Sequence, residues 1–245
     1  MKHRVAVRYS VPVDHIAPRT ATPSSPLRLG VLISGGGSGL AALLAHQSMK
    51  INLGQCSHRT VAVIADSDAP GLEHARTALV SAFAVPLPDL VQFLEPGGDC
   101  DAALKVRRRA HEEAIESLLI AADVELVILS GYMRILTTTF VRKWKGRLVN
   151  VHPSLLPSFP GAHAHRDVLA SGVEVTGCTV HFVDEGVDSG TIIAQREVGV
   201  ESDDDELSLS ERVKSVEHQL YPAVIDALSE GRVSITKSGV IIGGL

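Results

Sequence analysis

Residues 148–160 read L-V-N-V-H-P-S-L-L-P-S-F-P, an apolar strand sequence that ends in a proline-rich turn. Asn150 and His152 stand two residues apart, so their side chains leave a strand on the same face. Pro153 holds His152 in an extended conformation, and the strand is expected to end there. An amide and an imidazole therefore lie together at the carboxyl end of a strand, where open α/β sheets bind their ligands.

Alternating strand and helix patterns extend outward from this segment. Leu27–Ser34 is an apolar strand that runs into the glycine loop Gly35–Gly39 and then into a helix. Leu126–Leu129 is continuously apolar, which is typical of a strand covered on both faces. We expect an α/β fold, Rossmann-like and single-domain, with a twisted, mostly parallel sheet and helices on both faces, over residues 27–245. Residues 1–26, rich in proline, are expected to form a flexible leader.

The remaining elements are predicted from hydrophobic periodicity and turn residues. The predicted strands and helices are Thr60–Ala65, Leu72–Ala78, Ser81–Leu87, Asp101–Ala122, Thr139–Trp144, His165–Ser171, Thr176–Val183, Thr191–Val200 and Leu207–Leu228. Ser208 and Glu211 have the spacing of a capping box. The run Asp203–Asp205 is interpreted as solvated charge at a helix start. Val233–Ile242 is expected to add an edge strand.

Composition excludes several classes of protein. The 245 residues are 45% hydrophobic and 21% charged, an ordinary globular profile. The net charge of −5 gives no overall basic surface for nucleic acid. We find no apolar run near the roughly 20 residues of a membrane span and no secretory signal. Three scattered cysteines indicate a reduced, cytoplasmic setting without a zinc or redox motif.

The glycine loop has two interpretations. A glycine loop between a strand and a helix brings backbone N–H groups and a positive helix end onto an anion such as phosphate. The same residues also suit a tight turn that binds nothing. The G-x-x-x-x-G-K-[ST] and G-x-G-x-x-G patterns are both absent, which argues against that type of nucleotide hydrolysis and against a dinucleotide dehydrogenase.

Transfer of an acyl group between amines needs an oxyanion donor, a proton shuttle and a charge that holds the shuttle. Asn150 and His152 supply the first two. Spacing allows Asp184, Glu185 or Asp188 as the third group, and Asp188 lies in a glycine-bounded turn between two predicted strands. A purely structural asparagine and histidine at a strand end is the alternative.

Four segments together closely resemble the phosphoribosylglycinamide formyltransferases, folate-dependent enzymes of purine synthesis. They are L-I-S-G-G-G-S-G-L (32–40), S-G-Y-M-R-I-L (130–136), N-V-H-P-S-L-L-P-S-F-P-G-A-H-A-H (150–165) and H-F-V-D-E-G-V-D-S-G-T-I-I (181–193). The match runs in order from about Leu27 to about Val233. The resemblance implies a formyltransferase fold that transfers the formyl group of the co-substrate 10-formyltetrahydrofolate to the amine of glycinamide ribonucleotide, without a metal.

The resemblance also implies site residues. The catalytic trio falls on Asn150, His152 and Asp188. The ribotide phosphate is expected at Gly37, Ser38 and Gly39, with Lys214 and Glu217 from a late helix. The folate is expected against Met133, Arg134, Ile135, Leu136 and Asn150, with Arg108, or its neighbours Arg107 and Arg109, near the glutamate tail. Where the family usually has asparagine in the loop, this chain has Gly36 and Gly39, so side-chain contacts there are lost.

Relatives with the same trio provide rival functions. A formyltetrahydrofolate deformylase transfers the formyl group to water and normally has a regulatory domain before the catalytic one, for which residues 1–26 are too short. A methionyl-tRNA formyltransferase has a further domain for tRNA. A non-catalytic folate or nucleotide binder is the alternative from another class. We expect small-molecule substrates, no nucleic acid or membrane partner, and a monomer or homodimer.

Overall fold

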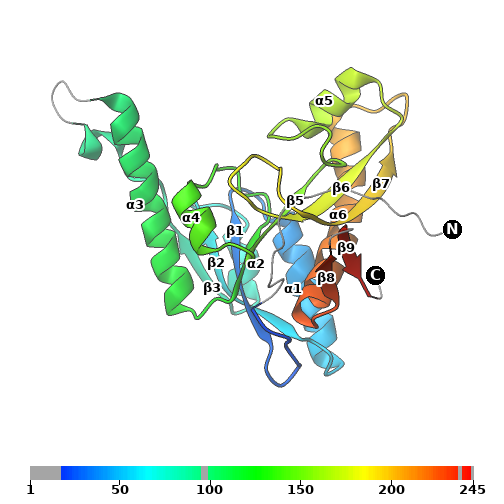
Figure 1. The fold of residues 1–245 in the computed structure, drawn as a ribbon, viewed down its shortest axis with the longest axis horizontal. Coiled ribbons are helices and arrows are strands. Elements are labelled where there is room, and N and C mark those ends of the chain that lie inside the picture. Colours follow the sequence, from blue (N-terminus) through cyan, green and yellow to red (C-terminus); the bar gives the residue numbers. More distant parts are fainter. Residues whose placement is uncertain (1–17, 95–98, 237–238, 244–245) are drawn as a thin grey trace.

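The computed structural model describes residues 18–94, 99–236 and 239–243. Within them, one sheet has seven strands in the order β3-β2-β1-β4-β5-β6-β7 (Figure 1). The first five of these run parallel, and β6 and β7 are antiparallel to their neighbours. The strands are β1 (Leu27–Ile33), β2 (His58–Ala65), β3 (Ser81–Ala84), β4 (Leu126–Leu129), β5 (Leu148–His152), β6 (Val175–Phe182) and β7 (Ile192–Gly199).

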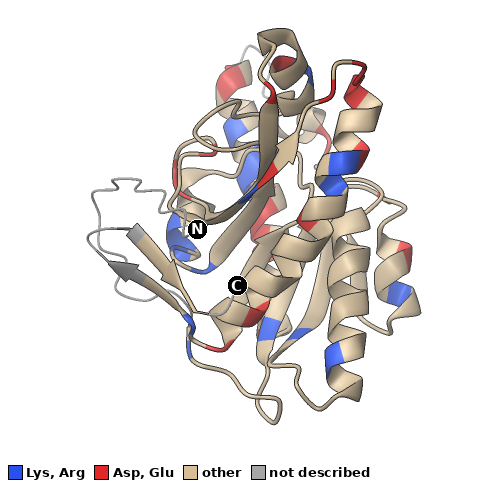
Figure 2. Ribbon diagram, turned by 90° about the vertical axis from the view of Figure 1, so that its right-hand side faces the viewer, with Lys and Arg blue, Asp and Glu red and all other residues tan. Residues whose placement is uncertain are grey.

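Helices cover both faces of this sheet, as the sequence predicted. One face packs against α1, α2, α5 and α6, and the other against α3 and α4. The helices are α1 (Ser38–Asn52), α2 (Leu72–Thr77), α3 (Cys100–Ala121), α4 (Thr138–Lys143), α5 (Ala164–Ser171) and α6 (Glu206–Ser229), with a short 3-10 turn, η1 (Leu90–Phe93). In the view of Figure 2, basic and acidic positions are interspersed along the elements.

The central strand β1 shows why this part of the sequence is continuously apolar. Val31 and Ile33 pack toward α1 and α6, whereas Leu32 packs toward α3 and α4. Gly30 lies under α3 so closely that a Cβ there would come within 2.5 Å of the Leu119 side chain. A strand covered on both faces needs apolar residues at successive positions, which confirms the interpretation of this run.

The carboxyl ends of the strands form one continuous edge. Leu32 pairs with Leu129, Leu129 with Asn150, and Asn150 with His181 across the neighbouring strands. The glycine loop after β1 and the segment after β4 therefore leave the sheet beside Asn150. The topology brings three predicted site segments, far apart in the chain, to the same edge.

The C-terminal region differs from the prediction. Val233–Ile242 does not extend the main sheet; β8 (Val233–Thr236) and β9 (Gly239–Ile242) form a separate antiparallel pair. The predicted capping box at Ser208 and Glu211 is also wrong. The helix begins one residue before the predicted Leu207, and its N-cap is Asp205, three residues before Ser208; Asp205 and Ser208 exchange the two capping hydrogen bonds.

Two segments that were expected to be solvated or flexible form specific hydrogen bonds with the rest of the chain. Asp204 is not simply solvated charge, because its carboxylate accepts hydrogen bonds from Arg212 at 2.6 and 2.8 Å. Residues 1–17 of the predicted leader lie outside the described residues. Residues 18–26 depart from a flexible leader: Arg19 forms two hydrogen bonds with Glu125, and the buried Ala21 donates its N–H to Ser229. Among the described residues, no helix is long and apolar enough to cross a bilayer.

Candidate active site

Asn150 and His152 end β5 with their side chains on the same face, as their spacing predicted. The Asn150 Nδ2 atom lies 3.4 Å from Asp188 Oδ1, and His152 Nδ1 lies 3.3 Å from Asp188 Oδ2. One carboxylate thus contacts both side chains from the turn between β6 and β7. The trio that sequence analysis assembled from two distant segments lies together in the fold.

The other two candidate carboxylates are occupied elsewhere. Asp184 accepts hydrogen bonds from Gly186 and Ser189 within its own turn. Glu185 is exposed and pairs with Arg142 on α4, at 2.8 and 2.9 Å. Asp188 is therefore the carboxylate of this turn that contacts His152.

Asp188 is held in an uncommon backbone conformation. Its φ of 51° lies in the left-handed region, where aspartate is tolerated better than most residues but is still under strain. The Gly161 N–H donates to its Oδ2 atom at 2.8 Å. Burial raises the pKa of Asp188, but the nearby His181 imidazole, the hydrogen bond from the Gly161 N–H and the charge of His152 together bring it down to about 2. The carboxyl group is therefore ionised at neutral pH.

His152 is enclosed by acceptors. Its side chain is buried, its Nε2 atom lies 2.8 Å from the Phe159 carbonyl, and Asp188 lies at its Nδ1 side. Both acceptors are satisfied together when both ring nitrogens carry a proton. Burial nevertheless lowers the pKa of His152, against the opposing effects of the Phe159 carbonyl and Asp188. This balance suits a group that gains and loses a proton.

His181 is a further member of the cluster and contacts Asn150 rather than His152. The His181 Nδ1 atom lies 2.9 Å from the Phe182 carbonyl, so this nitrogen is the donor. Its Nε2 atom then accepts from the Asn150 amide at 3.1 Å. His181 orients the Asn150 side chain, and the pairing of Asn150 with His181 between β5 and β6 explains the contact.

The glycine loop begins α1 with its backbone N–H groups free of side-chain caps. Gly37 is the N-cap residue, with a φ of 67°. A Cβ at Gly39 would lie 2.5 Å from the Ser130 hydroxyl, whereas a Cβ at Gly36 would meet nothing within 4 Å. The glycine at position 39 thus lets Ser130, the residue after β4, approach the loop, and Ser38 is the exposed side chain between Gly37 and Gly39.

Lys214 and Glu217 lie at the same end of the molecule as this loop. Helices α1 and α6 pack together, and His46 on α1 contacts Asp226 on α6. Ser57, shortly after the end of α1, hydrogen-bonds Ser229 at the end of α6, so the two helices run in the same direction. Gly37 and Glu217, each nine residues before a contact residue, therefore lie at similar heights along the helices. Lys214 is exposed, and burial raises the pKa of the half-buried Glu217 to about 7.

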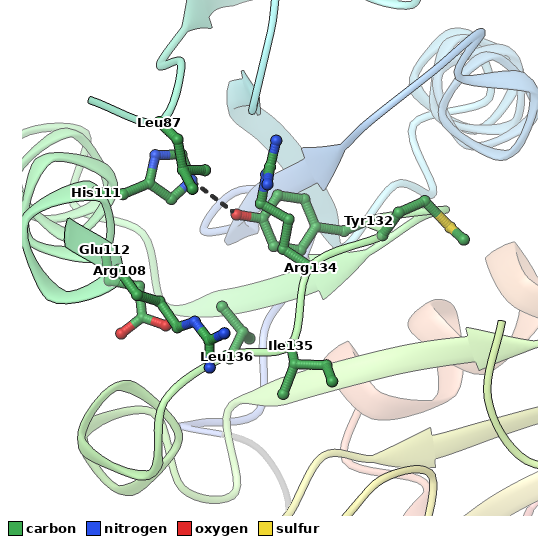
Figure 3. A pocket seen from close by; sticks show the side chains of 9 residues that line it. Leu87, Arg108, His111, Glu112, Tyr132, Arg134, Ile135 and Leu136 are labelled. Carbon is green, nitrogen blue, oxygen red and sulfur yellow. Dashed lines mark hydrogen bonds between the residues drawn. The ribbon is translucent and has the colours of Figure 1, made fainter. Parts of the chain in front are cut away.

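A cavity of about 270 Å³ opens beside the segment that follows β4 (Figure 3). Arg108, rather than Arg107 or Arg109, lines it. Arg107 donates to the Pro88 carbonyl, and Arg109 pairs with Glu113 on the helix surface. The full lining is Leu87, Arg108, His111, Glu112, Tyr132, Met133, Arg134, Ile135 and Leu136. Met133–Leu136 and the predicted arginine line one cavity, whereas Asn150, the other predicted folate contact, is not part of its lining.

Among the described residues, His46, His58 and Asp226 offer donor atoms within 4.8 Å of one another, close enough for a metal ion. Both imidazoles lie 2.9 Å from the Asp226 carboxylate, and the Lys50 ammonium lies 3.3 Å from it. We call these four residues the Asp226 clasp. They join α1, β2 and α6, and Lys50 already supplies a positive charge.

Gln47 determines how His58 enters the clasp. Its Oε1 atom accepts the Thr60 N–H at 3.3 Å, so its Nε2 atom is the donor toward His58 Nδ1 at 2.9 Å. The remaining His58 proton then sits on Nε2 and is donated to Asp226. A metal would need that nitrogen without its proton, so the network favours a hydrogen-bonded ion cluster.

Comparison with known proteins places this geometry in a family. A family-wide sequence profile described as formyl transferase matches residues 27–225. The chain belongs to the formyl transferase family. The matched range contains β1, the glycine loop, the cavity and the Asn150–His152–Asp188 cluster of this formyl transferase.

Individual relatives agree with the assignment. A phosphoribosylglycinamide formyltransferase of Mycobacterium tuberculosis (strain ATCC 25618 / H37Rv) is 40% identical over 227 residues, which cover 92% of this formyl transferase and 96% of the relative. The trifunctional purine biosynthetic protein adenosine-3 of Gallus gallus is 38% identical over 228 residues, 93% of this chain. The chain spans about a fifth of that relative, 21% of its length.

Solved structures agree as well. Glycinamide ribonucleotide transformylase 1 from Symbiobacterium toebii superposes with a TM-score of 0.75 at 40% identity, covering 89% of this chain and 94% of that one. A phosphoribosylglycinamide formyltransferase from Anaplasma phagocytophilum also gives 0.75, at 34% identity and the same coverage. These similarities confirm the predicted fold class.

Proposed function

We propose that this formyl transferase moves the formyl group of 10-formyltetrahydrofolate to the amine of glycinamide ribonucleotide, a step of purine biosynthesis. The observation that carries the proposal is the 40% identity to a phosphoribosylglycinamide formyltransferase of which 96% is covered. The cavity beside Met133–Leu136 and the Asn150–His152–Asp188 cluster support it independently.

The folate is proposed to occupy the cavity between α3 and the segment after β4. Its pterin would lie against the apolar side chains of Ile135 and Leu136, and a tail carboxylate would pair with Arg108, a geometry that guanidinium favours. Arg134 is engaged with Asp66 at 2.5 Å, so it is less available for the tail. The exposed Met133, 64% accessible, would gain contacts from the ligand.

The ribotide is proposed to bind on the α1 and α6 side of the same edge. Gly37, Ser38 and Gly39 form the N-terminus of a 15-residue helix. The backbone N–H groups there stabilise an anion. Lys214 would add a positive charge to the phosphate. Glu217, with a pKa near 7, would accept a hydrogen bond from the ribose or the amine.

The proposed chemistry is direct attack of the substrate amine on the formyl carbon. The new C–N bond forms as the carbonyl oxygen takes the negative charge, which the Asn150 amide stabilises by hydrogen bonding. His152 accepts the amine proton and passes it to the folate nitrogen as the old C–N bond breaks. Asp188 stabilises the imidazolium. The Phe159 carbonyl must release His152 Nε2 for this transfer.

The setting of the reaction is part of the proposal. The three cysteines, Cys56, Cys100 and Cys178, are unpaired, which suits a reducing cytoplasm. The enzyme would need no metal and would act as a monomer or homodimer.

One spectrophotometric assay tests the activity. A 10-formylfolate donor is mixed with the enzyme and with glycinamide ribonucleotide, initiator tRNA or water alone as acceptor. Rapid transfer that requires the ribotide is expected. Equal turnover in water alone would instead identify a deformylase, and donor binding without turnover would identify a non-catalytic folate binder.

A further inference from the structure

The cavity wall Met133–Leu136 has no regular secondary structure of its own, although it follows β4 and precedes α4. An irregular segment keeps a defined shape through contacts made elsewhere. Its N-terminal end is fixed by the Ser34 hydroxyl, which accepts the Met133 N–H at 2.9 Å. Tyr132, just before it, has its hydroxyl 3.1 Å from His111 Nε2 on α3 (Figure 3).

Glu112, the residue after His111 on α3, fixes the C-terminal end of the wall. The Thr137 N–H donates to one Glu112 carboxylate oxygen at 2.6 Å, and the Thr137 hydroxyl donates to the other. The same hydroxyl accepts the Phe140 N–H and so caps α4. Consecutive residues of one helix, His111 and Glu112, therefore hold the two ends of the wall.

Glu112 is an unusual residue for a structural tie. It is 5% exposed and also lines the cavity, one helical turn after Arg108. A buried carboxylate is costly unless its oxygens are hydrogen-bonded, and Thr137 satisfies both of them. The adjacent Glu113 is exposed and pairs with Arg109 on the helix surface. Glu112 therefore differs from the surface charges of α3, because its side chain is buried and lines the cavity.

We propose that Glu112 is a positioning residue for the folate co-substrate: its paired hydrogen bonds to Thr137 hold the Met133–Leu136 wall in its binding shape. The inference rests on the proposed function of the cavity. Glu112 touches neither the formyl group nor the amine, so it affects binding of the donor and leaves the chemical step unchanged. Helix α3 then contributes two residues to the folate site: Arg108, whose charge binds the tail, and Glu112, which holds the wall.

Steady-state kinetics test this role. Glu112→Ala leaves the Thr137 N–H and hydroxyl without their acceptor, and the KM for the formylfolate donor is expected to rise about tenfold, the effect of losing hydrogen bonds to a charged acceptor. The kcat and the KM for the ribotide should stay within about twofold. Glu112→Gln keeps one carbonyl acceptor and should give an intermediate KM. Glu113→Gln is the matched control and should behave as wild type.

A pH series adds a readout that a merely structural glutamate would not give. Burial raises the pKa of Glu112, against hydrogen bonds from Thr137, with Arg108 and Glu116 as its charged neighbours. Protonation removes an acceptor, so the donor KM of wild type should rise toward acidic pH. Subtracting the wild-type curve from that of Glu112→Gln should isolate this rise, because glutamine does not titrate.

The outcomes separate this inference from the proposed function. If wild type transfers no formyl group to the ribotide, the proposed function fails. If wild type is active but Glu112→Gln and Glu112→Ala lower kcat at an unchanged donor KM, or match Glu113→Gln, the positioning role is refuted. Should Glu112→Ala fail to fold, Thr137→Val, which removes one donor, must raise the donor KM, and Thr137→Ser must restore it.

Discussion

The Asp226 clasp provides a prediction whose size follows from the structure. Replacing Asp226 by Asn removes the charge that His46, Lys50 and His58 share. The side chain of Asp226 is 8% exposed, so water cannot replace the lost interactions. We expect Asp226→Asn to fold, because the amide has nearly the same shape, but to be less stable at neutral pH.

The magnitude comes from the pKa of this carboxyl group. Burial raises it, but hydrogen bonds from His58 and His46 bring it from 3.8 down to about 2. A tenfold change in proton affinity is worth about 1.4 kcal/mol, so the ionised group contributes about 2 kcal/mol to the free energy of unfolding. Because the folded-state pKa is the lower one, this contribution is present above about pH 4. It is lost as the pH falls toward 2, and about half is gone at pH 3.

Thermal and urea unfolding between pH 3 and pH 7 measure the effect. At pH 7 the variant should unfold about 4–8 °C below wild type, the shift that 2 kcal/mol gives in a chain of this size. The gap should narrow toward pH 3. Asp68→Asn is the control, since Asp68 is exposed and its side chain has no hydrogen bond or ion pair in the part of the chain that the structure describes. An equal gap at both pH values would refute the reasoning.

Three further predictions concern the site. His152→Ala should lower formyl transfer by about 10²–10⁴-fold while folate binding, measured by fluorescence quenching, is largely kept. Arg108→Ala should raise the KM for the donor about tenfold, whereas Arg107→Ala should change it little; similar values would exclude Arg108 from the tail site. Gly71→Ala places a Cβ 2.7 Å from the Gly35 carbonyl. It should cost about 1–3 kcal/mol of stability in urea unfolding and raise the KM for the ribotide.

The fold was predictable where the chain repeats a short-range pattern. Leu126–Leu129 and the long helix α6 were located to within a residue, because burial on two faces, or on one helical stripe, leaves a periodic signal. Val233–Ile242 was misplaced for the opposite reason. Its apolar pattern predicts a strand, but which strand it pairs with depends on packing between distant segments, which a short stretch of sequence does not show.

The site was predictable in part. Asn150 and His152 are neighbours on one strand, so spacing alone places them together, whereas the choice of Asp188 over Asp184 depended on resemblance. Glu112 gave no signal, because it resembles a surface charge of α3 and its partner Thr137 lies 25 residues away. Contacts of this kind appear only when helices and strands are assembled.

The left-handed backbone at Asp188 has a consequence for how its carboxylate is probed. Asparagine adopts that conformation readily, so Asp188→Asn removes the charge and one acceptor oxygen but keeps the turn. Alanine there adds a backbone penalty of about 1 kcal/mol or more to the loss of charge. The difference between the two variants therefore measures the backbone turn together with the one acceptor oxygen that asparagine keeps.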